Sequence, residues 1–405
     1  MSAPRMVIVE GVRTPFCKWN THFASLGADE LGRIAVDALL TRTGLDPVLI
    51  DEVILGCVCQ PAEAVNVARV IALRAGVPES VPAVTVHRNC ASGLEAVTLA
   101  SERIAAGRGS VFVVGGTESM SQVPLLFKPG TAKKFAAFAG AKSVLKKLGA
   151  LTQFRFSDFE PRIALKLGLT DPVSGLNMGE TAELLAREHS ISREEQDLFA
   201  VQSHQRAIAA CEKFSQEICP VYVNGQAITK DNGPRADSSL PALAKLKPVF
   251  DRQYGTVTAG NSSQISDGAV ALLVMTEQKA AELGYQPLGR LSAYAYTGCD
   301  PARMGLGPVS AIRKMGRSAG TADVIEINEA FAAQVLAVLK VLGDVPLEKL
   351  NVNGGAIALG HPVGATGARL VLSALKELQR RNGHRALVSL CVGGGQGGAA
   401  WLERD

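Results

Sequence analysis

Short apolar segments with a β-favouring composition alternate with helix-like segments near both ends of this 405-residue chain. In the first part, runs of Val and Ile are separated by stretches in which apolar residues recur with the period of an amphipathic helix. The strand-like runs cover 6–16, 51–58, 83–89 and 110–120, and the helix-like runs cover 29–44, 66–76 and the segment after residue 90. Such a series predicts a mostly parallel sheet covered by helices.

The last part of the chain repeats this arrangement. Strand-like runs cover 288–299, 322–332 and 385–403, and helix-like runs cover 308–320, 332–343 and 352–381. In each half, a loop with one reactive residue, Cys90 or His361, opens a helix, and a strand ending in glycines follows. This weak repeat predicts two similar halves that bring their strand-to-helix corners to a shared centre. We predict an N-terminal half at 1–120, an inserted region that returns to the core at 121–276, and a C-terminal half at 277–405.

The inserted region begins with a strongly basic stretch. Its cations are Lys128, Lys133, Lys134, Lys142, Lys146, Lys147, Arg155, Arg162 and Lys166, against only Asp158 and Glu160. Apolar residues recur at roughly helical spacing within it, at Phe135, Phe138, Val144, Leu145 and Leu148. Two interpretations are open: the solvated face of a helical excursion, or an amphipathic surface that touches an anionic membrane or a partner subunit. Further along, Ser192 and Glu195 predict a capping box at a helix start.

Composition narrows the class of protein. A hydrophobic fraction of 47% with 41 glycines suits an α/β enzyme, and a net charge of +4 gives no global argument for binding nucleic acid. The eight cysteines are sparse, and Cys57 and Cys59 lack the second pair that a zinc site needs, so we expect free thiols and no metal. We recognise no signal peptide and no apolar run that could span a bilayer, and we therefore expect a reducing, cytoplasmic compartment.

Cys90 stands at one of the predicted strand-to-helix corners, within the stretch Val84 to Ala100. A side chain at such a corner faces the positive end of the helix dipole and its unpaired N–H groups. This position is expected to depress the pKa of the thiol and to produce thiolate near neutral pH. The alternative is that Cys90 is one more small buried hydrophobe, and this stretch alone leaves both interpretations open.

Three further stretches lie at the end of a predicted strand or the start of a helix, where α/β sheets carry their active sites. They are Asn328 to Gln334, Gly360 to Arg369 and Cys391 to Gly398. Each stretch alone is a weak signal. Together with Asn-Cys-Ala-Ser-Gly around Cys90, and in this order, they closely resemble the thiolase family, and the likeness covers essentially the whole chain, from "VRTPF" to the terminal "CVGGGQGGA".

The resemblance implies a fold and a reaction. The fold is the thiolase fold, an α/β architecture of two duplicated βαβ halves in five layers (α-β-α-β-α) with an inserted loop domain. The reaction is the reversible cleavage of a 3-oxoacyl-CoA by coenzyme A, which gives acetyl-CoA and a shortened acyl-CoA. Coenzyme A is then a substrate, no cofactor stays bound, and a homodimer or higher oligomer is expected.

By the same resemblance, Cys90 is the nucleophile, which forms a thioester without a change of oxidation state. His361 takes the Cys90 proton, as a neutral imidazole can near pH 7. Cys391 moves a proton to or from C2 of acetyl-CoA, and the pKa of its thiol is expected near the ordinary value of ~8.5. Asn328, acting through a water, and His361 correspond to one oxyanion hole. The backbone N–H groups of Cys90 and Gly393 correspond to a second, and such donors are typically worth roughly 3–4 kcal/mol of barrier each.

Four residues match positions that face the substrate in the family. Ser263 and Met178 correspond to the lining of the pantetheine and acyl channel. Phe331 corresponds to a position beside the reacting thioester, with simple core packing as the alternative. Arg235 corresponds to the nucleotide end, where a guanidinium can face a phosphate or stack on adenine. For Ser263, Met178 and Arg235, a purely structural role is equally open.

Two departures from the family pattern bear on the substrate. The acetoacetyl-specific branch has a histidine where this chain has Asn177. The basic stretch resembles the thiolase subunit of trifunctional β-oxidation complexes, yet that subunit has a histidine in place of Asn328. We predict a degradative 3-ketoacyl-CoA thiolase of medium or broad chain-length range in fatty-acid β-oxidation. The alternatives are an acetyl-CoA C-acetyltransferase that forms acetoacetyl-CoA, and a docking subunit that holds a hydratase/dehydrogenase partner through the basic stretch.

Overall fold

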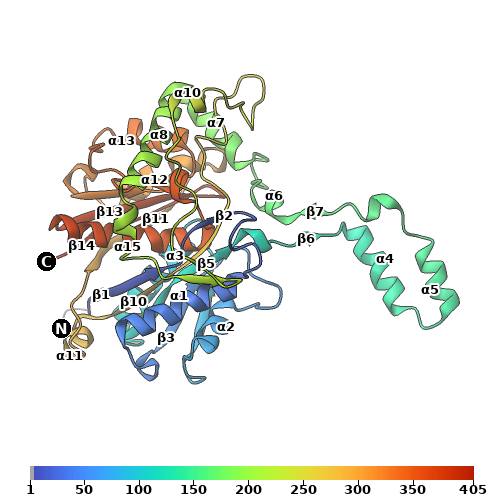
Figure 1. The fold of residues 1–405 in the computed structure, drawn as a ribbon, viewed down its shortest axis with the longest axis horizontal. Helices are drawn as coiled ribbons and strands as arrows, with labels where there is room; N and C mark the ends of the chain where they lie inside the picture. The colour runs from blue at the N-terminus through green and yellow to red at the C-terminus, as the bar shows by residue number, and fades with distance from the viewer. Residues whose placement is uncertain (1–3) are drawn as a thin grey trace. The chain divides into compact units, whose positions relative to one another are not determined.

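The computed structural model describes residues 4–405, which divide into two compact units. Unit 1 contains residues 4–122 and 171–405, and unit 2 contains Val123–Thr170. A ten-stranded sheet organises unit 1, in the order β12-β13-β14-β11-β1-β10-β5-β3-β4, with β2 paired to β10 (Figure 1).

The sheet consists of two half-sheets that meet between β1 and β11. The first contains β1 (Met6–Arg13), β2 (Cys17–Lys18), β3 (Glu52–Gly56), β4 (Ala83–Val86), β5 (Val111–Ser119) and β10 (Ser266–Thr276). The second contains β11 (Gly289–Gly298), β12 (Val324–Ile327), β13 (Arg385–Val392) and β14 (Gln396–Glu403). The junction is short, because β1 pairs with β11 only at Val7 and Ile8.

The prediction of a mostly parallel sheet is wrong, because the sheet is mixed. Among the described strands, β3 pairs in parallel with β4 and β5, and β12 pairs in parallel with β13. The other pairings are antiparallel. The difference arises because β10 returns from the long inserted region to lie between β1 and β5, and because a tight glycine turn joins β13 directly to β14.

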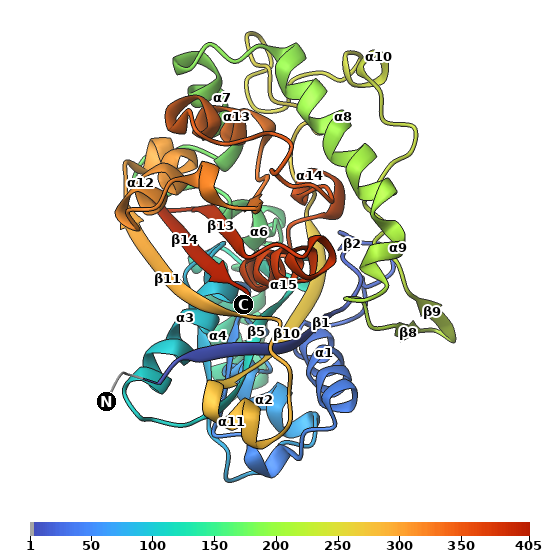
Figure 2. The ribbon, with the colours of Figure 1, turned by 90° about the vertical axis from the view of Figure 1, so that its left-hand side faces the viewer.

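Helices cover both faces of each half-sheet and give unit 1 five layers, as the thiolase resemblance implies. The outer helices of the first half are α1 (Ala28–Thr43) and α2 (Val67–Arg74), and those of the second are α12 (Gly307–Lys314) and α13 (Ala332–Leu342). The central layer contains α3 (Ser92–Ala105) and α15 (Val363–Arg381), which pack on each other. Figure 2 shows α15 between β13 and β14 on one side and β1 and β10 on the other.

The central position of α15 explains its composition. Its residues from Gly364 to Leu378 are all buried, including several charged side chains. Such charges are tolerated in a core when they are paired. Arg369 donates to Glu326 of β12 at 2.9 Å, and Lys376 pairs with Glu10 of β1 at 2.8 Å. The helix therefore ties both half-sheets together.

The rest of unit 1 lies between residues 171 and 282 and around the loops of the second half. Its elements are α7 (Met178–Glu188), α8 (Arg193–Ala209), α9 (Cys211–Phe214), β8 (Val221–Val223), β9 (Gln226–Ile228), α10 (Leu240–Leu243), α11 (Glu277–Glu282) and α14 (Ala356–Leu359). The predicted capping box at α8 is confirmed, with Ser192 Oγ accepting from Glu195 N at 3.1 Å. Across residues 4–405, no helix combines the length and apolarity needed to cross a bilayer.

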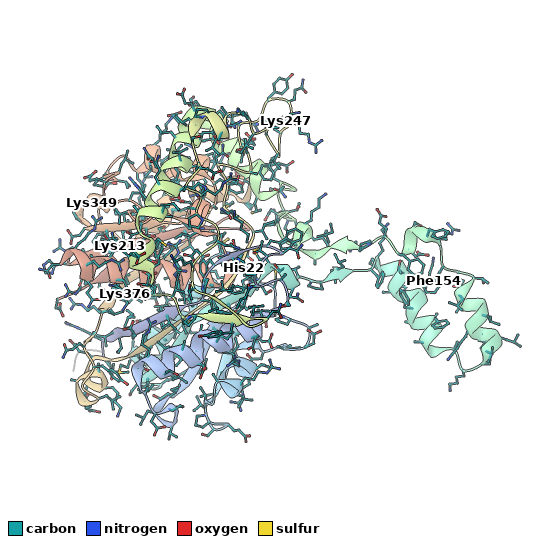
Figure 3. All side chains as sticks on the ribbon, in the orientation of Figure 1. His22, Phe154, Lys213, Lys247, Lys349 and Lys376 are labelled. Carbon is teal, nitrogen blue, oxygen red and sulfur yellow. The ribbon has the colours of Figure 1, made fainter. Side chains whose placement is uncertain are left out.

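Unit 2 is built on a small aromatic cluster. Its elements are β6 (Leu125–Leu126), α4 (Pro129–Gly140), α5 (Val144–Leu151), β7 (Arg162–Ile163) and α6 (Ala164–Gly168). The Phe135 ring of α4 lies 5.1 Å from that of Phe127 and 4.9 Å from that of Phe154, the residue labelled in Figure 3. By contrast, α5 buries none of its own residues, and its apolar side chains are exposed.

Candidate active site

The two central helices bring the two predicted corners together. Cys90 lies two residues before α3, and His361 lies two residues before α15. The first turns of these helices touch at Gly93, where a Cβ would lie 2.8 Å from Ala368 N and 2.9 Å from Gly364 O. Glycine is required there because the two backbones leave no room for a side chain. The N-termini of both helices therefore open toward one site.

Cys90 is half-buried at its corner, between β4 and α3. Burial raises the pKa of its thiol, although hydrogen bonds from the backbone N–H of Gly393 and from its own N–H act in the opposite direction. The expectation of a depressed pKa is therefore wrong for the thiol at rest. Removal of the sulfur from water outweighs the helix terminus and the two donors. A thiolate at this position needs a neighbouring base.

The hydrogen bonds of His361 define which of its two ring nitrogens is free. The Thr366 hydroxyl donates to Pro362 O at 2.9 Å, and its oxygen lies 2.7 Å from His361 Nδ1. Because the hydroxyl has one hydrogen, Nδ1 must carry the proton that joins them, and Nε2 carries the lone pair. Nε2 is buried without a partner in the described chain. Burial, with a smaller contribution from Arg369, lowers the pKa of His361 to about 4, so the ring is neutral near pH 7.

Asn328 presents a second unpartnered polar group. It follows β12, and its backbone N–H donates to Ser389 O of β13 at 2.9 Å, two residues before Cys391. Its side chain is fully buried, yet neither Oδ1 nor Nδ2 has a partner within the described residues. A buried amide without partners is costly, and at functional sites it marks a place where a ligand or a water binds.

Cys391 and Gly393 come from the end of β13 and the turn that follows it. Cys391 is fully buried, and both burial and the neighbouring Cys90 raise its pKa well above the ordinary thiol value. The expectation of an ordinary pKa is therefore wrong, and Cys391 is held as a protonated thiol. The Gly393 N–H reaches the Cys90 sulfur from the opposite half of the sheet. The site thus contains two thiols, a neutral imidazole and an unpartnered amide.

Three of the predicted substrate residues line this region. Phe331 packs in one apolar cluster with Met178 and Cys391, and its ring centre lies 6.0 Å from that of Phe250. The Met178 sulfur also lies next to Gly393, 3.5 Å from where a Cβ would stand. The N–H of Ser263 donates to Ala330 O at 2.9 Å, beside Phe331. Met178, Phe250 and Phe331 form an apolar wall beside Cys391, and Ser263 is hydrogen-bonded to the segment that carries Phe331.

Arg235 lies apart from this wall. Its side chain is largely exposed and donates to Asp237 through Nε at 3.1 Å and Nη2 at 2.9 Å, while its backbone N–H donates to His204 Nδ1 at 3.2 Å. The structure brings it near Lys18, whose pKa is lowered by burial and by the Arg235 charge. No described contact joins Arg235 to Cys90 or the other predicted residues.

Comparison with known proteins identifies the family. The model of the thiolase N-terminal domain matches residues 6–278, and that of the thiolase C-terminal domain matches residues 285–404. The chain belongs to the thiolase family. As a thiolase it is an acyltransferase.

Relatives of this thiolase carry two kinds of name. It is 44% identical over 412 residues to an acetyl-CoA acetyltransferase of Pseudomonas aeruginosa, with 99% of each chain covered. It is 40% identical over 424 residues to a 3-ketoacyl-CoA thiolase of Serratia proteamaculans, with 98% of this chain and 97% of the relative covered. Among solved structures, human mitochondrial 3-ketoacyl-CoA thiolase in complex with CoA matches with a TM-score of 0.89 at 38% identity, over 99% of this chain and 98% of that one.

The structure also reveals residues of the thiolase site that sequence reasoning missed. Thr366 fixes the orientation of His361, and its position on the first turn of α15 was the available signal. Glu118 is fully buried at the end of β5 and accepts hydrogen bonds from Cys59 N and Gly364 N, both at 2.9 Å. It thereby ties α15 to the loop after β3, and burial raises its pKa to about 6. No short-range sequence pattern reveals such long-range partners.

Asn177 begins α7 as its N-cap: its side chain accepts from Gly179 N at 2.9 Å, and the Glu180 side chain accepts from Asn177 N at 2.6 Å. Its side chain is therefore occupied by the helix start.

Across residues 4–405, no cluster of three or more His, Cys, Asp or Glu side chains is arranged to hold a metal ion, and all eight cysteines are free.

Proposed function

We propose that this thiolase cleaves 3-oxoacyl-CoA with coenzyme A through an acyl-enzyme on Cys90, giving acetyl-CoA and a shortened acyl-CoA. The observation that carries the proposal is the bare Nε2 of a neutral, buried His361 at the corner that meets Cys90. No bound cofactor is needed, because a thiolate can exchange one thioester for another. Coenzyme A acts as a substrate.

The residues divide the reaction into two acyl transfers, each accompanied by proton transfers to or from His361 and Cys391. The Cys90 proton passes to His361 Nε2, and the thiolate attacks C3 of the substrate. The C2–C3 bond breaks, and the C2 carbanion takes its proton from Cys391, which burial keeps protonated. The thiol of coenzyme A then passes its proton to the Cys391 thiolate and attacks the Cys90 thioester, which releases the shortened acyl-CoA. The Cys90 thiolate takes its proton back from His361, so both cysteines end protonated and the imidazole ends neutral.

Negative charge on two oxygens is met by two sets of donors. We assign the N–H groups of Cys90 and Gly393 to the oxygen on C3. We assign Asn328, through a water, and His361 to the thioester oxygen of the departing acetyl-CoA. His361 can donate there because Nε2 has just received the Cys90 proton. Removal of one such donor typically costs roughly 3–4 kcal/mol of barrier.

The remaining predicted residues are assigned to substrate binding. Met178, Phe331 and Ser263 line the path of the acyl chain and the pantetheine arm. This suits the packing of Met178 and Phe331 against Cys391 and the hydrogen bond from Ser263 N to Ala330 O beside Phe331. Arg235, together with Lys18, binds the nucleotide end of coenzyme A, where two adjacent cations favour a phosphate. Asp237 must release Arg235 for this contact.

The residue at the start of α7 bears on the chain-length range of the substrate. We propose a degradative enzyme of medium or broad range in fatty-acid β-oxidation, because Asn177 is occupied as a helix cap and no histidine stands there. The alternative, an acetyl-CoA C-acetyltransferase, uses the same residues and is supported by relatives with that name. A purely docking role is disfavoured by the complete set of reactive groups.

The test is CoA-dependent thiolysis of acetoacetyl-CoA, 3-oxooctanoyl-CoA and 3-oxohexadecanoyl-CoA, followed as loss of the enolate absorbance of the 3-oxoacyl-CoA. Comparable or higher kcat/KM for the two longer substrates is the expected result. Cleavage of acetoacetyl-CoA alone would move the enzyme to the acetoacetyl branch. Absence of turnover with all three would contradict the proposed function.

We further propose that unit 2 binds an anionic membrane surface. On α5 the apolar side chains Val144, Leu145, Leu148 and Leu151 are 74%, 82%, 54% and 49% exposed. Lys146 and Lys147 lie on the same helix as these apolar residues. Within the unit, only Lys128 and Lys134 pair with the two carboxylates of the basic stretch. An apolar stripe beside cations is the pattern of a helix that lies in a lipid interface.

Vesicle sedimentation tests this surface. Binding to phosphatidylcholine vesicles is expected only when phosphatidylglycerol is added, and Lys146→Glu/Lys147→Glu should weaken it at least about 30-fold, given roughly 1 kcal/mol per juxtamembrane cation. Lys245→Glu/Lys247→Glu makes the same change of charge elsewhere and should bind normally. Unchanged vesicle binding by Lys146→Glu/Lys147→Glu would favour the alternative that the basic stretch is only a solvated face. Loss of a co-purifying hydratase/dehydrogenase chain instead would indicate subunit docking.

Assembly, organisation and location complete the proposal. We propose a homodimer, because β4 ends the sheet and its residues are only partly buried, which leaves an edge that a second copy can cover. Sedimentation velocity measures this directly.

The free state of all eight cysteines supports a reducing, cytoplasmic compartment. The division into halves at 1–120 and 277–405, with 121–276 inserted, stays a proposal, and limited proteolysis tests its boundaries.

A further inference from the structure

The glycine turn between β13 and β14 has no side chains of its own to hold it. Its residues are Gly393, Gly394 and Gly395, with φ of +88° at Gly394 and +78° at Gly395. Glycine reaches these angles easily but resists other conformations weakly. The far end is anchored, because Cys299 N donates to Gly395 O at 2.7 Å. The near end carries the Gly393 N–H that the proposed reaction uses.

Asn89 anchors the near end from the opposite half of the chain. Its side-chain Nδ2 donates to Gly393 O at 2.7 Å, across 304 positions of sequence. Asn89 has a left-handed backbone, with φ of +43°, which asparagine tolerates better than most residues. Its carbonyl accepts from Ser92 N at 3.0 Å and from Ser92 Oγ at 2.7 Å. The amide is therefore presented by a turn that is itself fixed at the start of α3.

Gly393 is confined on two sides by this arrangement. A Cβ at Gly393 would lie 3.5 Å from the Met178 sulfur and 3.8 Å from Asn89 Nδ2. The carbonyl of Gly393 accepts from the Asn89 side chain, while the N–H of Gly393 donates to the sulfur of Cys90, the residue that follows Asn89. The turn before α3 thus carries both Cys90, the proposed nucleophile, and Asn89, which holds the residue whose N–H is the proposed oxyanion donor.

We propose that Asn89 is a positioning residue for acyl transfer: its amide holds the Gly393 carbonyl, and this keeps the Gly393 N–H aimed at the reacting centre beside Cys90. The inference rests on the proposed role of Gly393 as an oxyanion donor. The tether keeps the two N–H donors, which come from different half-sheets, in register while charge develops on the oxygen. Preorganised donors act because they need not move during the reaction.

A simpler role for Asn89 is to tolerate the left-handed backbone. Asn89→Gly separates the two roles, because glycine accepts this φ and lacks the amide. Asn224 provides a matched control: it has φ of +49° in the turn between β8 and β9, far along the chain from Cys90. Asn224→Gly makes the same chemical change at the same kind of backbone position. Asn89→Asp keeps the shape of the side chain and cannot donate.

With acetoacetyl-CoA as substrate, Asn89→Gly should lower kcat about 10- to 100-fold and leave KM within about 3-fold, because a small misplacement of a reacting group costs up to about 100-fold. The pH profile of iodoacetamide alkylation of Cys90 in the free enzyme should move upward, because the sulfur loses a donor. Asn89→Asp should lower kcat as well. Asn224→Gly should match the wild type in both measurements.

Each outcome decides something different. Wild-type kcat and an unshifted alkylation profile in Asn89→Gly would overturn the inference and leave the proposed function standing. A wild-type enzyme that forms no acyl-enzyme would overturn the proposed function, and the alkylation profiles would still test the tether. If Asn89→Gly fails to fold by circular dichroism, Asn89→Asp makes the decision: a wild-type kcat there would overturn the inference.

Discussion

At the residue scale, burial and local hydrogen bonding act in opposite directions on the reactive thiols. The start of α3 and the Gly393 N–H favour a Cys90 thiolate, yet burial raises its pKa, and it raises that of Cys391 further. In the proposed reaction, the thiolate of Cys90 is therefore formed by proton transfer within the site. This makes the state of His361, whose Nδ1 is bonded to Thr366, the decisive feature of the resting enzyme.

Thr366→Val should lower the rate of Cys90 acylation about 10- to 100-fold. The valine cannot accept from Nδ1–H, so the ring is no longer held with its lone pair on Nε2, and partners of this kind are typically worth that much. Thr366→Ser keeps the hydroxyl and should retain most of the activity. Single-turnover acylation by acetoacetyl-CoA measures both, and equal rates for Val and Ser would contradict the tautomer assignment.

The lowered pKa of His361 predicts that the acylation rate depends on pH in an unusual way on the acid side. Because the pKa of about 4 lies below the ordinary value of ~6.5, the neutral base persists as the pH falls through ~6.5. The unfolded chain binds a proton at this histidine more readily than the folded chain does. The neutral ring therefore contributes stability to the fold above pH ~6.5, and this contribution is lost as the pH falls toward 4. Acylation rates measured from pH 8 down to 5 should show no titration centred near ~6.5, and such a titration would speak against the buried base.

Alanine variants of Cys90 and Cys391 should lose different steps of the reaction. Cys90→Ala should abolish acyl transfer, because no nucleophile remains, while the fold is retained. Cys391→Ala should still form the acyl-enzyme but fail to exchange the C2 proton of acetyl-CoA, because that proton needs the second thiol. Mass spectrometry detects the acyl-enzyme, and deuterium exchange followed by NMR reports the proton. Normal exchange in Cys391→Ala would remove its assigned role.

At the element scale, the crossing of α3 and α15 sets the distance between the reactive corners. The helices approach through glycines, so their separation leaves no room for a methyl group. A Cβ at Gly367 would lie 2.4 Å from Leu94 N, which is backbone and cannot turn away. The geometry between Cys90 and His361 therefore depends on a helix contact that contains neither residue.

Gly367→Ala should destabilise the fold by about 1–3 kcal/mol or more, because the added methyl group forces a closely packed core apart. Gly149→Ala is the control, since no atom lies within 4 Å of the added Cβ in α5, and alanine favours a helix by about 1 kcal/mol there. Urea unfolding followed by circular dichroism compares the two. An unchanged midpoint for Gly367→Ala would show that the helices can shift apart at little cost.

At the scale of the whole molecule, the chemistry and the basic surface belong to different units. All the proposed catalytic residues lie in unit 1, and the exposed apolar helix lies in unit 2. The ends of unit 2 meet in a short antiparallel pair, with Leu126 opposite Arg162. This pairing provides a natural place to shorten the chain.

Replacement of residues 127–161 by Asn-Gly, a sequence that favours two-residue hairpin turns, should remove vesicle binding and keep thiolysis of acetoacetyl-CoA. The expected kcat is within about 3-fold of the wild type, because no proposed catalytic residue is removed. Vesicle sedimentation and the thiolysis assay on the same preparation provide the comparison. A large loss of kcat in a folded variant would show that unit 2 also serves the reaction.

Much of the local structure was predictable. The helix expected at 29–44 is α1 at Ala28–Thr43, and the strand expected at 110–120 is β5 at Val111–Ser119. The capping box at Ser192 was visible because its two residues lie three positions apart. Periodicity and capping act over one or two turns of chain, so the sequence carries them directly. The family motifs likewise identified Cys90, His361 and Cys391 as candidates.

The sequence by itself therefore determined many of the helices and strands and the kinds of reactive group at the corners. The tertiary structure alone decided the antiparallel placement of β10, the raised pKa of Cys90 and Cys391, the free Nε2 of His361 and the tether from Asn89 to Gly393. The reason is physical: strand order, desolvation and hydrogen bonds across hundreds of positions depend on which distant segments meet. No local pattern of residues records those meetings.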